Sequence, residues 1–435
     1  MKRAMNAALI LLLALFMFAL GYLARRNDWI PLEWRQAARS GTDNIRANRP
    51  FQGDAFPLQD RSGVDAETRA TLAAMGYMQG TKAATSSGGV MLNDSSLAYA
   101  GSNLVVSGHA PEAVLIDMAG NVLHTWRCTL DEAIPGYEKP PHVRDAARES
   151  WRRAYLYPDG SLLAIFEGMA LIKLDTGSKV VWSYTAGCHH DMQVLPDGNI
   201  YVLTSEARDG VIDNGIALLD ANGKELRRIS LLDGFRNSVY APLLAWLPIE
   251  GDLLHVNTVN VMDGVNADHI PAFAAGNLLI SSLTLNTIAI VDFQSGTVPW
   301  ALTGMTVAQH EPTLLQNGNI LVFDNRGAGE TSRVLEIDPV TREVVWKHPE
   351  NGGAPFYSEW CGSVQRLPNG NTLITETDNG RAFEVSPEHK VVWEYINPNQ
   401  FDEKDVRMVA ALFDVVRLEP DYAKSWLAEA LPRKK

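Results

Sequence analysis

Three histidines occupy corresponding positions in this chain of 435 residues. His190 lies six residues before a turn at Pro196, and His310 stands at the same distance before the matching turn at Gln316. His255 opens the corresponding segment between them, displaced from its turn by an insertion. Imidazole titrates near neutral pH, so it can serve as a nucleophile, as a general acid or base, or as a donor to an anionic group. Histidines that converge can also bind zinc or another transition metal.

The histidines belong to a repeated pattern. A turn, a short β-branched run and a tryptophan recur, and the five tryptophans are Trp126, Trp182, Trp300, Trp346 and Trp393. A sixth copy at 223–229 keeps the turn and the strand but lacks the tryptophan. Self-similarity at roughly 40 residues, with the pattern of four strands, predicts an all-β fold, a six-bladed β-propeller. The 78 residues from Gly198 to Gly276 leave room for a seventh blade.

A propeller would bring the histidines together. The first strand of each blade lines the central channel, so we expect the three imidazoles to converge at one mouth of it. A single histidine at a strand start is more often structural, but three at equivalent positions favour a function. Asp191 and Glu311 follow two of the histidines, and strand alternation predicts that these acids point away from the channel. That argues against a metal site, and no cofactor-binding motif occurs, so we expect neither metal nor cofactor.

The chain divides into four predicted segments. Residues 1–26 form a signal anchor or signal peptide, 27–95 a tether with a short helix, 96–398 the six-bladed propeller, and 399–435 a helical tail. Two insertions, 231–251 and 263–273, lack the repeat phrases and are interpreted as loops on the blades. The tail is predicted to be an amphipathic helix on the outside of the propeller, from the apolar spacing of Val406, Val409, Leu412, Phe413 and Val416.

The N-terminal segment predicts export. Residues 7–24 form an apolar run of 18, flanked by Lys2-Arg3 and Arg25-Arg26. This is the lower limit for a membrane-spanning helix and longer than most signal-peptide cores, so we favour an uncleaved signal anchor over a cleaved signal. The balanced flanking charges leave the orientation open. Together with the family resemblance described below, this segment leads us to expect the protein at the periplasmic face of the inner membrane, or free in the periplasm if the segment is cleaved.

Composition excludes some partners. The net charge is −13 and no basic stripe occurs, which argues against nucleic acid as a partner. A hydrophobic content of 46% with 20% charged residues is typical of a globular protein. The three cysteines, Cys128, Cys188 and Cys361, allow at most one disulfide. Cys188 beside His189 is more typical of a small buried residue than of a nucleophile.

The segments around the histidines resemble a known family. They are 189–199, 255–257 and 309–325, together with the opening segment 110–126. Over roughly residues 95–400 they are similar to the bacterial arylsulfotransferases. The resemblance implies a periplasmic propeller enzyme that transfers a sulfuryl group from an aryl sulfate to a phenolic acceptor without a nucleotide donor. It also implies a histidine that is transiently sulfurylated.

The resemblance also implies roles for individual residues. The nucleophile is His310, while His190 and His255 hold the sulfuryl oxygens and exchange protons with the phenols. Asn257 adds a side-chain donor, and His189 is expected to contact substrate. Neutral imidazole is a competent nucleophile at pH 7, and sulfuryl transfer, like phosphoryl transfer, mainly requires positioning and charge-matched donors.

One position departs from the family pattern. Where the family carries an arginine, after Leu-Ile-Ser-Ser, this chain has Leu283, which offers no bidentate contact to a sulfuryl group. Arg326 is the nearest substitute and is predicted to bind substrate, with Arg152 or Arg381 next. Two alternatives stay open. One is a non-catalytic or differently specialised propeller that binds a small anion or an envelope glycan. The other is a polysaccharide lyase, for which no matched Tyr or Arg motif is present.

Overall fold

The computed structural model describes residues 82–430, apart from 248, 328, 330, 351, 352 and 404. The predicted signal anchor and most of the predicted tether lie outside the described residues. Among the residues that are described, no helix is both long enough and apolar enough to cross a membrane.

Antiparallel strands dominate the described residues, and most of them form four-stranded units, each named here by its second strand. The β3 unit contains β28 (Leu412–Leu418), β3 (Ser102–Ser107), β4 (Glu112–Asp117) and β5 (Val122–Arg127). The β7 unit contains β6 (Arg153–Leu156), β7 (Leu162–Phe166), β8 (Met169–Leu174) and the first half of β9 (Val180–Val194). The β10 unit contains the second half of β9, β10 (Ile200–Arg208), β11 (Val211–Leu219) and β12 (Glu225–Ser230).

The remaining units follow the same order. The β15 unit contains β14 (Val256–Val261), β15 (Leu278–Ser282), β16 (Thr287–Asp292) and β17 (Thr297–Thr303). The β19 unit contains β18 (His310–Leu314), β19 (Ile320–Asp324), β20 (Arg333–Ile337) and β21 (Val344–His348). The β23 unit contains β22 (Ser363–Arg366), β23 (Thr372–Glu376), β24 (Arg381–Val385) and β25 (Val391–Ile396), with β2 (Gly89–Asn93) at its outer edge.

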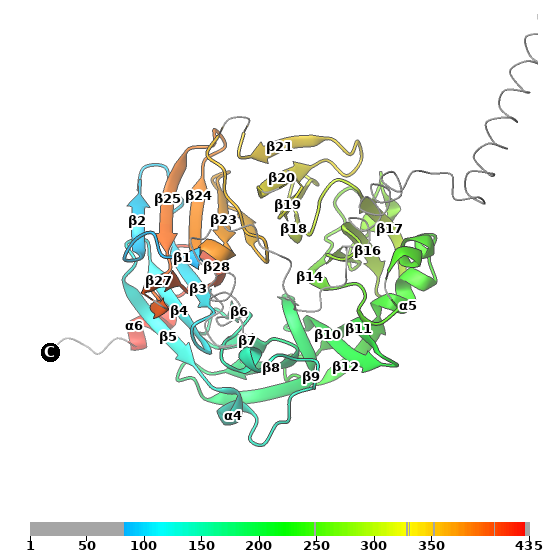
Figure 1. Ribbon diagram of the computed structural model, residues 1–435, viewed down its shortest axis with the longest axis horizontal. Helices are drawn as coiled ribbons and strands as arrows, with labels where there is room; N and C mark the ends of the chain where they lie inside the picture. The colour runs from blue at the N-terminus through cyan, green and yellow to red at the C-terminus, as the bar shows by residue number, and fades with distance from the viewer. Residues whose placement is uncertain are drawn as a thin grey trace, which may run out of the picture. The chain divides into compact units, whose positions relative to one another are not determined.

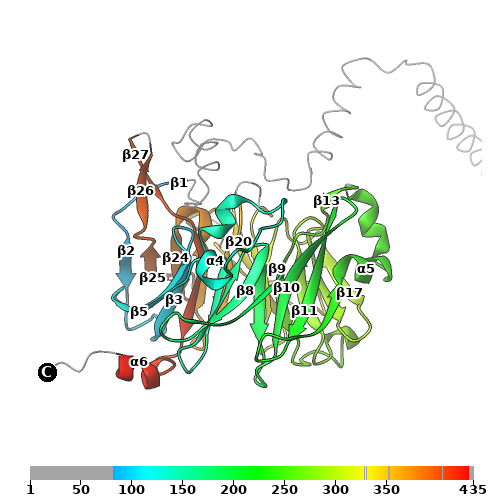
Figure 2. The same cartoon turned by 90° about the horizontal axis from the view of Figure 1, so that it is seen from below.

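These units surround a common axis, as Figure 1 shows. Their first strands contact one another around that axis: β9 contacts β14, β14 contacts β18, β18 contacts β22, and β22 contacts β28. The side view in Figure 2 shows the units standing next to one another around the same axis. A ring of four-stranded antiparallel sheets is a β-propeller, as the repeats predict.

The two repeated phrases have clear structural roles. The second phrase is a turn followed by an apolar strand, as at 158–163 and 316–321. Its turn joins the first and second strands of a unit, and the strand that it opens is buried on both faces in β7, β15, β19 and β23. A strand covered on both faces is a continuous apolar run without alternation. The turn needs glycine: Gly160 has φ +82°, and a Cβ there would lie 2.4 Å from the Thr176 side chain.

The repeated order of turn, β-branched run and tryptophan predicts that each tryptophan lies on the third or fourth strand of its blade. In the structure the tryptophans lie on fourth strands. Three of them donate an indole N–H to a backbone carbonyl in a turn of the next unit, at 3.0, 3.2 and 3.1 Å respectively: Trp126 to Gly160, Trp346 to Pro387 and Trp393 to Met118. Trp126 and Trp393 are completely buried. The recurring tryptophan therefore ties one sheet to the next, which explains its spacing.

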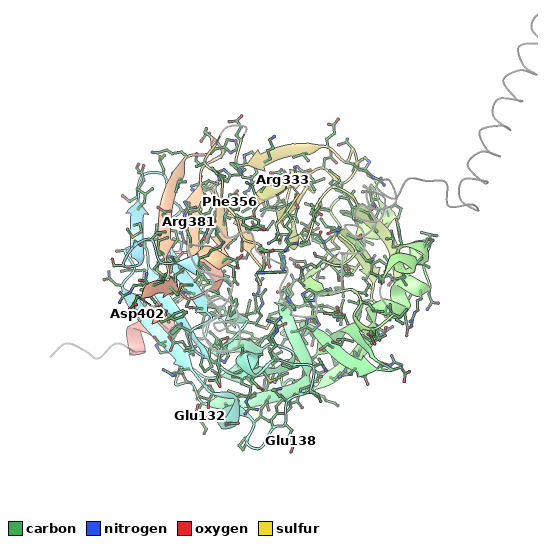
Figure 3. All side chains as sticks on the ribbon, viewed as in Figure 1. Glu132, Glu138, Arg333, Phe356, Arg381 and Asp402 are labelled. Carbon is green, nitrogen blue, oxygen red and sulfur yellow. The ribbon has the colours of Figure 1, made fainter. Side chains whose placement is uncertain are left out.

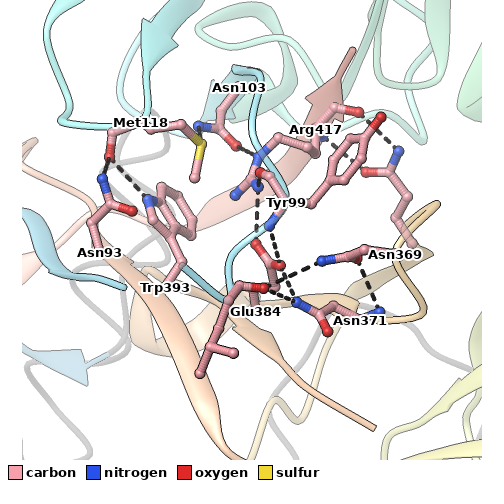
Figure 4. A network of polar contacts seen from close by, with 11 residues as sticks. Asn93, Tyr99, Asn103, Met118, Asn369, Asn371, Glu384, Trp393 and Arg417 are labelled. Atoms are coloured by element: carbon pink, nitrogen blue, oxygen red, sulfur yellow. Dashed lines mark hydrogen bonds and ion pairs between the residues drawn. The ribbon is translucent and has the colours of Figure 1, made fainter. Parts of the chain in front are cut away.

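The chain ends close the ring. β28 near the C-terminus pairs with β3 near the start of the described residues. From β28, the buried Arg417 donates to the buried Glu384 on β24 at 2.9 Å and to Asn103 at 2.6 Å, and Asn371 donates to Glu384 at 2.6 Å (Figure 4). Pairing thus brings the strand near the C-terminus into the first unit, and the charged network joins that unit to the last one.

The prediction of an amphipathic helix in the tail is wrong. Val406 and Val409 are the first and last residues of β27 (Val406–Val409), which pairs with β26 (Gln400–Glu403) and β1 (Lys82–Ala83). Leu412 is the first residue of β28. The helical spacing arose by chance from two strands separated by a short break. β28 is buried on both faces for most of its length, so its apolar residues do not alternate. Among the described residues of the tail, only α6 (Lys424–Ala430) is helical.

Short helices fill the connections. The first insertion forms α5 (Leu231–Arg236), the 3-10 helix η2 (Ala241–Trp246) and β13 (Gly251–Asp252), which pairs with β11. The second insertion contains η3 (Pro271–Phe273). Elsewhere lie α4 (Leu130–Ala133), η1 (Asp145–Arg148) and η4 (Thr377–Asn379). The insertions therefore decorate the β10 and β15 units, as predicted.

Candidate functional site

Irregular backbone in the inner strands places the three histidines. His190 lies in the second half of β9, His255 comes directly before β14, and His310 is the first residue of β18. The pairing register shifts beside each of them, so each first strand carries a bulge at this level. His190 and His255 have φ of 51° and 45°, a region that residues other than glycine seldom adopt. Bulges and strained backbone of this kind re-aim side chains and cluster at functional sites.

His190 is held by a carboxylate from the neighbouring unit. Its Nδ1 lies 2.9 Å from Oε1 of Glu167, and its backbone N–H donates to Oε2 of the same group, also at 2.9 Å. Burial lowers the pKa of the His190 imidazole to about 4, and Glu167 offsets only part of that shift. Burial alone would raise the pKa of Glu167, but His190 lowers it below its usual range. At neutral pH this is a neutral imidazole beside an ionised carboxylate.

His255 has a closer acid partner. Its Nδ1 donates to Oδ2 of Asp252 at 2.7 Å, and its backbone N–H donates to Oδ1 at 3.0 Å. Burial would lower the pKa of His255, but the charge and hydrogen bond of Asp252 raise it above its usual value. The ring stands edge-on to that of His190, with centroids 4.9 Å apart. Of the three imidazoles, His255 keeps its second proton to the highest pH.

His310 has a neutral partner instead. Its Nδ1 lies 2.9 Å from Oδ1 of Asn325 and 3.1 Å from the carbonyl of Ala308. The Asn325 amide nitrogen donates to the carbonyls of Ser358 and Cys361, so its oxygen must accept and His310 Nδ1 must donate. Burial lowers the pKa of His310 to about 3, and the hydrogen bond to Asn325 only partly offsets this. The ring is therefore neutral, with its lone pair on Nε2.

All three rings share this orientation, because each Nδ1 faces an oxygen acceptor. A fixed Nδ1–H leaves the lone pair of a neutral imidazole on Nε2. Among the described residues, Nε2 of His190 and Nε2 of His310 have no hydrogen-bond partner within the chain. Two neutral bases thus stand beside one imidazole whose pKa is raised. Neighbouring groups with separated pKa values are what acid–base and nucleophilic chemistry require.

One group of side chains has the composition of a metal site. Ligand atoms of Glu167, His189 and His190 lie within 4.8 Å of one another, which is the only such group among the described residues. Hydrogen bonds account for this proximity: His189 Nε2 donates to the Thr204 carbonyl at 3.1 Å, which leaves its Nδ1 to accept from His190 at 2.9 Å. The three residues could hold an ion only by giving up this arrangement.

Solved structures with low sequence identity resemble the chain. A protein of unknown function from Bacteroides caccae has a TM-score of 0.47 and 15% identity, covering 72% of this chain and 98% of that one. A streptogramin B lyase has a TM-score of 0.42 and 14% identity, covering 76% and 96%. The Cps50 (Swd1) β-propeller domain of Myceliophteria thermophila has a TM-score of 0.42 and 12% identity, covering 72% and 87%. No curated protein matches the chain.

A family model for arylsulfotransferases (ASST) matches residues 153–398, more than half of the chain. The matched segment contains His190, His255 and His310 with the partners of all three Nδ1 atoms. The chain belongs to the arylsulfotransferase family. Family membership agrees with the resemblance seen in the sequence and with the propeller fold.

In this arylsulfotransferase family member, Leu283 lies at the site. It follows β15, and its backbone N–H donates to the carbonyl of His255 at 3.1 Å. Arg326 is engaged elsewhere, because its guanidinium pairs with Glu359 at 2.5 Å and stacks on Trp360 at 5.0 Å. Arg381 lies on β24, near Phe356 and away from the axis, as Figure 3 shows. It pairs there with two carboxylates, of Glu376 at 3.2 Å and of Glu394 at 2.6 Å.

Two other predicted substrate-binding residues of this family member support the histidines from behind. The amide nitrogen of the buried Asn257 donates to the carbonyl of Gln309 at 2.9 Å, and so holds the backbone directly before His310. His189 is also buried, and it contacts Thr204 and His190 as described. Both side chains position the site in this structure, and their predicted contacts with substrate stay predictions.

The expectation that the adjacent acids point away from the channel is wrong. Arg153 on β6 pairs with Asp191 at 3.1 Å, with Glu311 at 2.5 Å and with Asp414 at 3.2 Å. These residues come from the first strands of different units, so they meet at the axis. The bulges interrupt strict alternation, and Glu311 itself has φ of 53°. Burial, with two other acids nearby, raises the pKa of Glu311 to about 7 despite Arg153.

Sequence reasoning missed the partners of the three Nδ1 atoms. Asp252 carried a usable signal, since it stands three residues before His255. Glu167 directly follows β7 and Asn325 directly follows β19, and both stand nine residues after the turn residues Pro158 and Gln316, an equivalence that the sequence prediction did not use. Only the arrangement of the units brings Glu167 to a histidine of the next unit.

Proposed function

We propose that this chain is an arylsulfotransferase that moves a sulfuryl group from an aryl sulfate to a phenolic acceptor through a covalent intermediate on His310. The observation that carries the proposal is the 2.9 Å hydrogen bond from His310 Nδ1 to the Asn325 amide oxygen, which leaves a neutral Nε2 with a lone pair. Membership of the arylsulfotransferase family supports the same reaction.

In the first half-reaction, His310 Nε2 attacks the sulfur of the aryl sulfate. The N–S bond forms as the bond from sulfur to the aryl oxygen breaks. The protonated His255 gives its Nε2 proton to the departing phenolate, and this suits the imidazole whose pKa Asp252 raises. His190, neutral at pH 7, stands beside His255.

In the second half-reaction, an acceptor phenol replaces the product. Its proton passes to the neutral imidazole of His190 or His255, and its oxygen attacks the sulfur. The N–S bond then breaks and the electron pair returns to His310 Nε2. Donor and acceptor bind in turn at one site, so the kinetics are expected to be ping-pong.

The test is phenol-to-phenol exchange with 4-nitrophenyl sulfate and mass spectrometry of the protein. His310→Ala should abolish both exchange and the covalent sulfuryl adduct. His190→Ala or His255→Ala should slow transfer by about 10²–10⁴ and still permit the adduct, because each removes only a donor or a proton carrier. His269→Ala, on an exposed loop, is the matched control and should behave as wild type. An adduct on the His310→Ala variant would refute the assignment.

The alternative is a propeller that binds an anion or an envelope glycan without transferring a sulfuryl group. Leu283 favours it, because this apolar residue, whose backbone contacts that of His255, stands where the family places a cation. Failure of folded wild-type protein to exchange any aryl sulfate, with sulfate binding retained, would favour this alternative.

The proposed architecture has six blades. The units named after β3, β7, β10, β15, β19 and β23 supply one blade each, and β9 serves two of them. The first strands of these units contact their neighbours around the axis, which supports this count. An experimental structure with another unit inserted in the ring would contradict it.

We also propose that the protein is held at the periplasmic face of the inner membrane. The apolar run at 7–24 supports an uncleaved anchor, since its length approaches that of a spanning helix. Full-length protein should stay with membranes after alkaline carbonate washing. Release of a shortened chain into the periplasm would indicate a cleaved signal instead.

A further inference from the structure

Arg152 occupies the repeat position of the catalytic histidines. It lies six residues before the turn at Pro158, the same spacing that separates His190 and His310 from their turns. The β7 unit therefore presents a guanidinium where the β10 and β19 units present an imidazole.

The residues that directly follow Arg152, His190 and His310 support this alignment of the repeats. The residues that follow these three in sequence are Arg153, Asp191 and Glu311, and they meet in one ion-paired cluster at the axis. Because the followers share a layer, Arg152 belongs to the adjacent layer with the two histidines. Asp414 joins the same cluster, and the residue before it, Phe413, is the one on which Arg152 rests.

The surroundings of Arg152 leave its charge available. Its guanidinium lies 5.2 Å from the ring centroid of Phe413, and its side chain is half-buried. No carboxylate among the described residues pairs with it, whereas Arg153, Arg326 and Arg381 are all paired. A half-buried guanidinium without an acid partner favours an anionic ligand.

The charge of Arg152 acts on the site. Burial is the main reason for the low pKa values of His190 and His310, and Arg152 lowers both further. It also opposes the raised pKa of His255. One cation thus influences all three imidazoles, as expected for a group in the same layer.

We propose that Arg152 binds the sulfuryl oxygens of the substrate and of the transition state, in the role that Leu283 cannot perform. The proposal rests on the proposed function and names the ligand class as an aryl ester of a tetrahedral oxyanion. A guanidinium offers paired N–H donors to two oxygens of such a group. The negative charge of the sulfuryl group then faces Arg152 and the protonated His255 while His310 attacks.

The test compares Arg152→Gln and Arg152→Lys with a matched control, Arg227→Gln. Arg227 lies on the outer strand β12, and its guanidinium lies 5.2 Å from the ring centroid of Phe293 and donates to Gln294. The control therefore removes a stacking contact of the same length, together with these hydrogen bonds, far from the axis. Two measurements are made: exchange with 4-nitrophenyl sulfate, and calorimetric binding of that compound to protein carrying His310→Ala. Near-ultraviolet circular dichroism confirms that each variant is folded.

We expect Arg152→Gln to lower kcat/KM by about 10²–10³, the usual effect of losing an oxyanion donor. Binding to the His310→Ala background should weaken at least about tenfold, as for one lost charge-assisted hydrogen bond. Arg152→Lys should recover part of both losses, because it restores the charge without the paired donors. Leu283→Arg added to Arg152→Gln should also recover activity, because it restores a cation beside His255.

The two proposals can fail separately. If wild type exchanges sulfate and Arg152→Gln is within twofold of it, the role of Arg152 is refuted and the proposed function stands. If wild type does not exchange sulfate but binds the aryl sulfate through Arg152, the proposed function fails and the anion-binding role stands. Binding that Arg152→Gln leaves unchanged would refute the role of Arg152 in either case.

Discussion

The Nδ1 partners of His255 and His310 differ in charge, and this difference helps to separate the pKa values of the two imidazoles. Asp252 is an ionised acceptor close to His255 and raises its pKa, whereas Asn325 is neutral and leaves His310 with a pKa of about 3. A nucleophile must be unprotonated and a general acid must be protonated at the same pH. In the proposed reaction, His310 and His255 would meet these two needs because their Nδ1 partners differ in charge.

This difference predicts a pH effect for Asp252→Asn. The proposed reaction uses the protonated form of His255, so the rate should fall as pH rises through the raised pKa of His255. Removing the carboxylate leaves burial as the dominant influence, which lowers that pKa. The alkaline limb of kcat/KM against pH should therefore move to lower pH in the variant.

The control for this measurement is Asp233→Asn, an exposed acid at the start of α5, which should leave the profile unchanged. An alkaline limb that stays in place in Asp252→Asn would mean that His255 is not the general acid. A profile limited on its acid side near pH 4 would agree with the lowered pKa of His190 acting as a base.

At the scale of the elements, the first strand of each unit positions the side chains at the axis, and β28, the last strand in the sequence, is one of these first strands. β28 supplies the first strand of the β3 unit, although it lies near the C-terminus. It carries Asp414 into the axial cluster and Phe413 beneath Arg152. The element that the sequence pattern presented as a surface helix is thus an inner strand.

Leu412→Ala tests this role of β28. Leu412 is fully buried and packs in a core shared with Leu373 and Trp393 of the β23 unit. Its truncation should lower the free energy of unfolding by about 2–5 kcal/mol, as for other buried leucines. Chemical denaturation followed by tryptophan fluorescence measures the change.

The control is Val344→Ala on β21, where the side chain is 43% exposed, and it should change the free energy of unfolding by less than about 0.5 kcal/mol. A similarly small effect of Leu412→Ala would indicate that the tail lies on the surface after all.

At the scale of the whole molecule, a ring of sheets is stable only if its ends are joined. Pairing of β28 with β3 joins them, and the Arg417–Glu384 pair extends the junction to the β23 unit. Both side chains of that pair have no exposed surface. Removing one partner from such a pair leaves a buried charge without compensation.

Glu384→Gln should therefore lower the free energy of unfolding by about 3–5 kcal/mol. The double variant Glu384→Gln with Arg417→Met should be more stable than the single variant, because no uncompensated charge remains. Asp94→Asn, which breaks the exposed pair with Lys390, is the comparison and should have a far smaller effect. Equal effects of the two single variants on the urea midpoint would show that the buried pair does not hold the junction.

The sequence alone was enough to predict the features of the structure that recur in every unit. The turn phrases and the tryptophans repeat because every unit uses the same turn and ties itself to the next in the same way. They therefore predicted the propeller, the tryptophans on third or fourth strands and the equivalent placement of His190 and His310. The family resemblance, confirmed by the family model, added the reaction class.

Contacts between units were decided only by the tertiary structure. Glu167 reaches His190 from another unit, and Arg153 gathers three acids from three further strands. No local pattern encodes such contacts, because they depend on the bulges and on the closure of the ring. The tail illustrates the same limit: a strand buried on both faces loses the alternation that identifies strands in a sequence, so only its pairing with β3 revealed what it is.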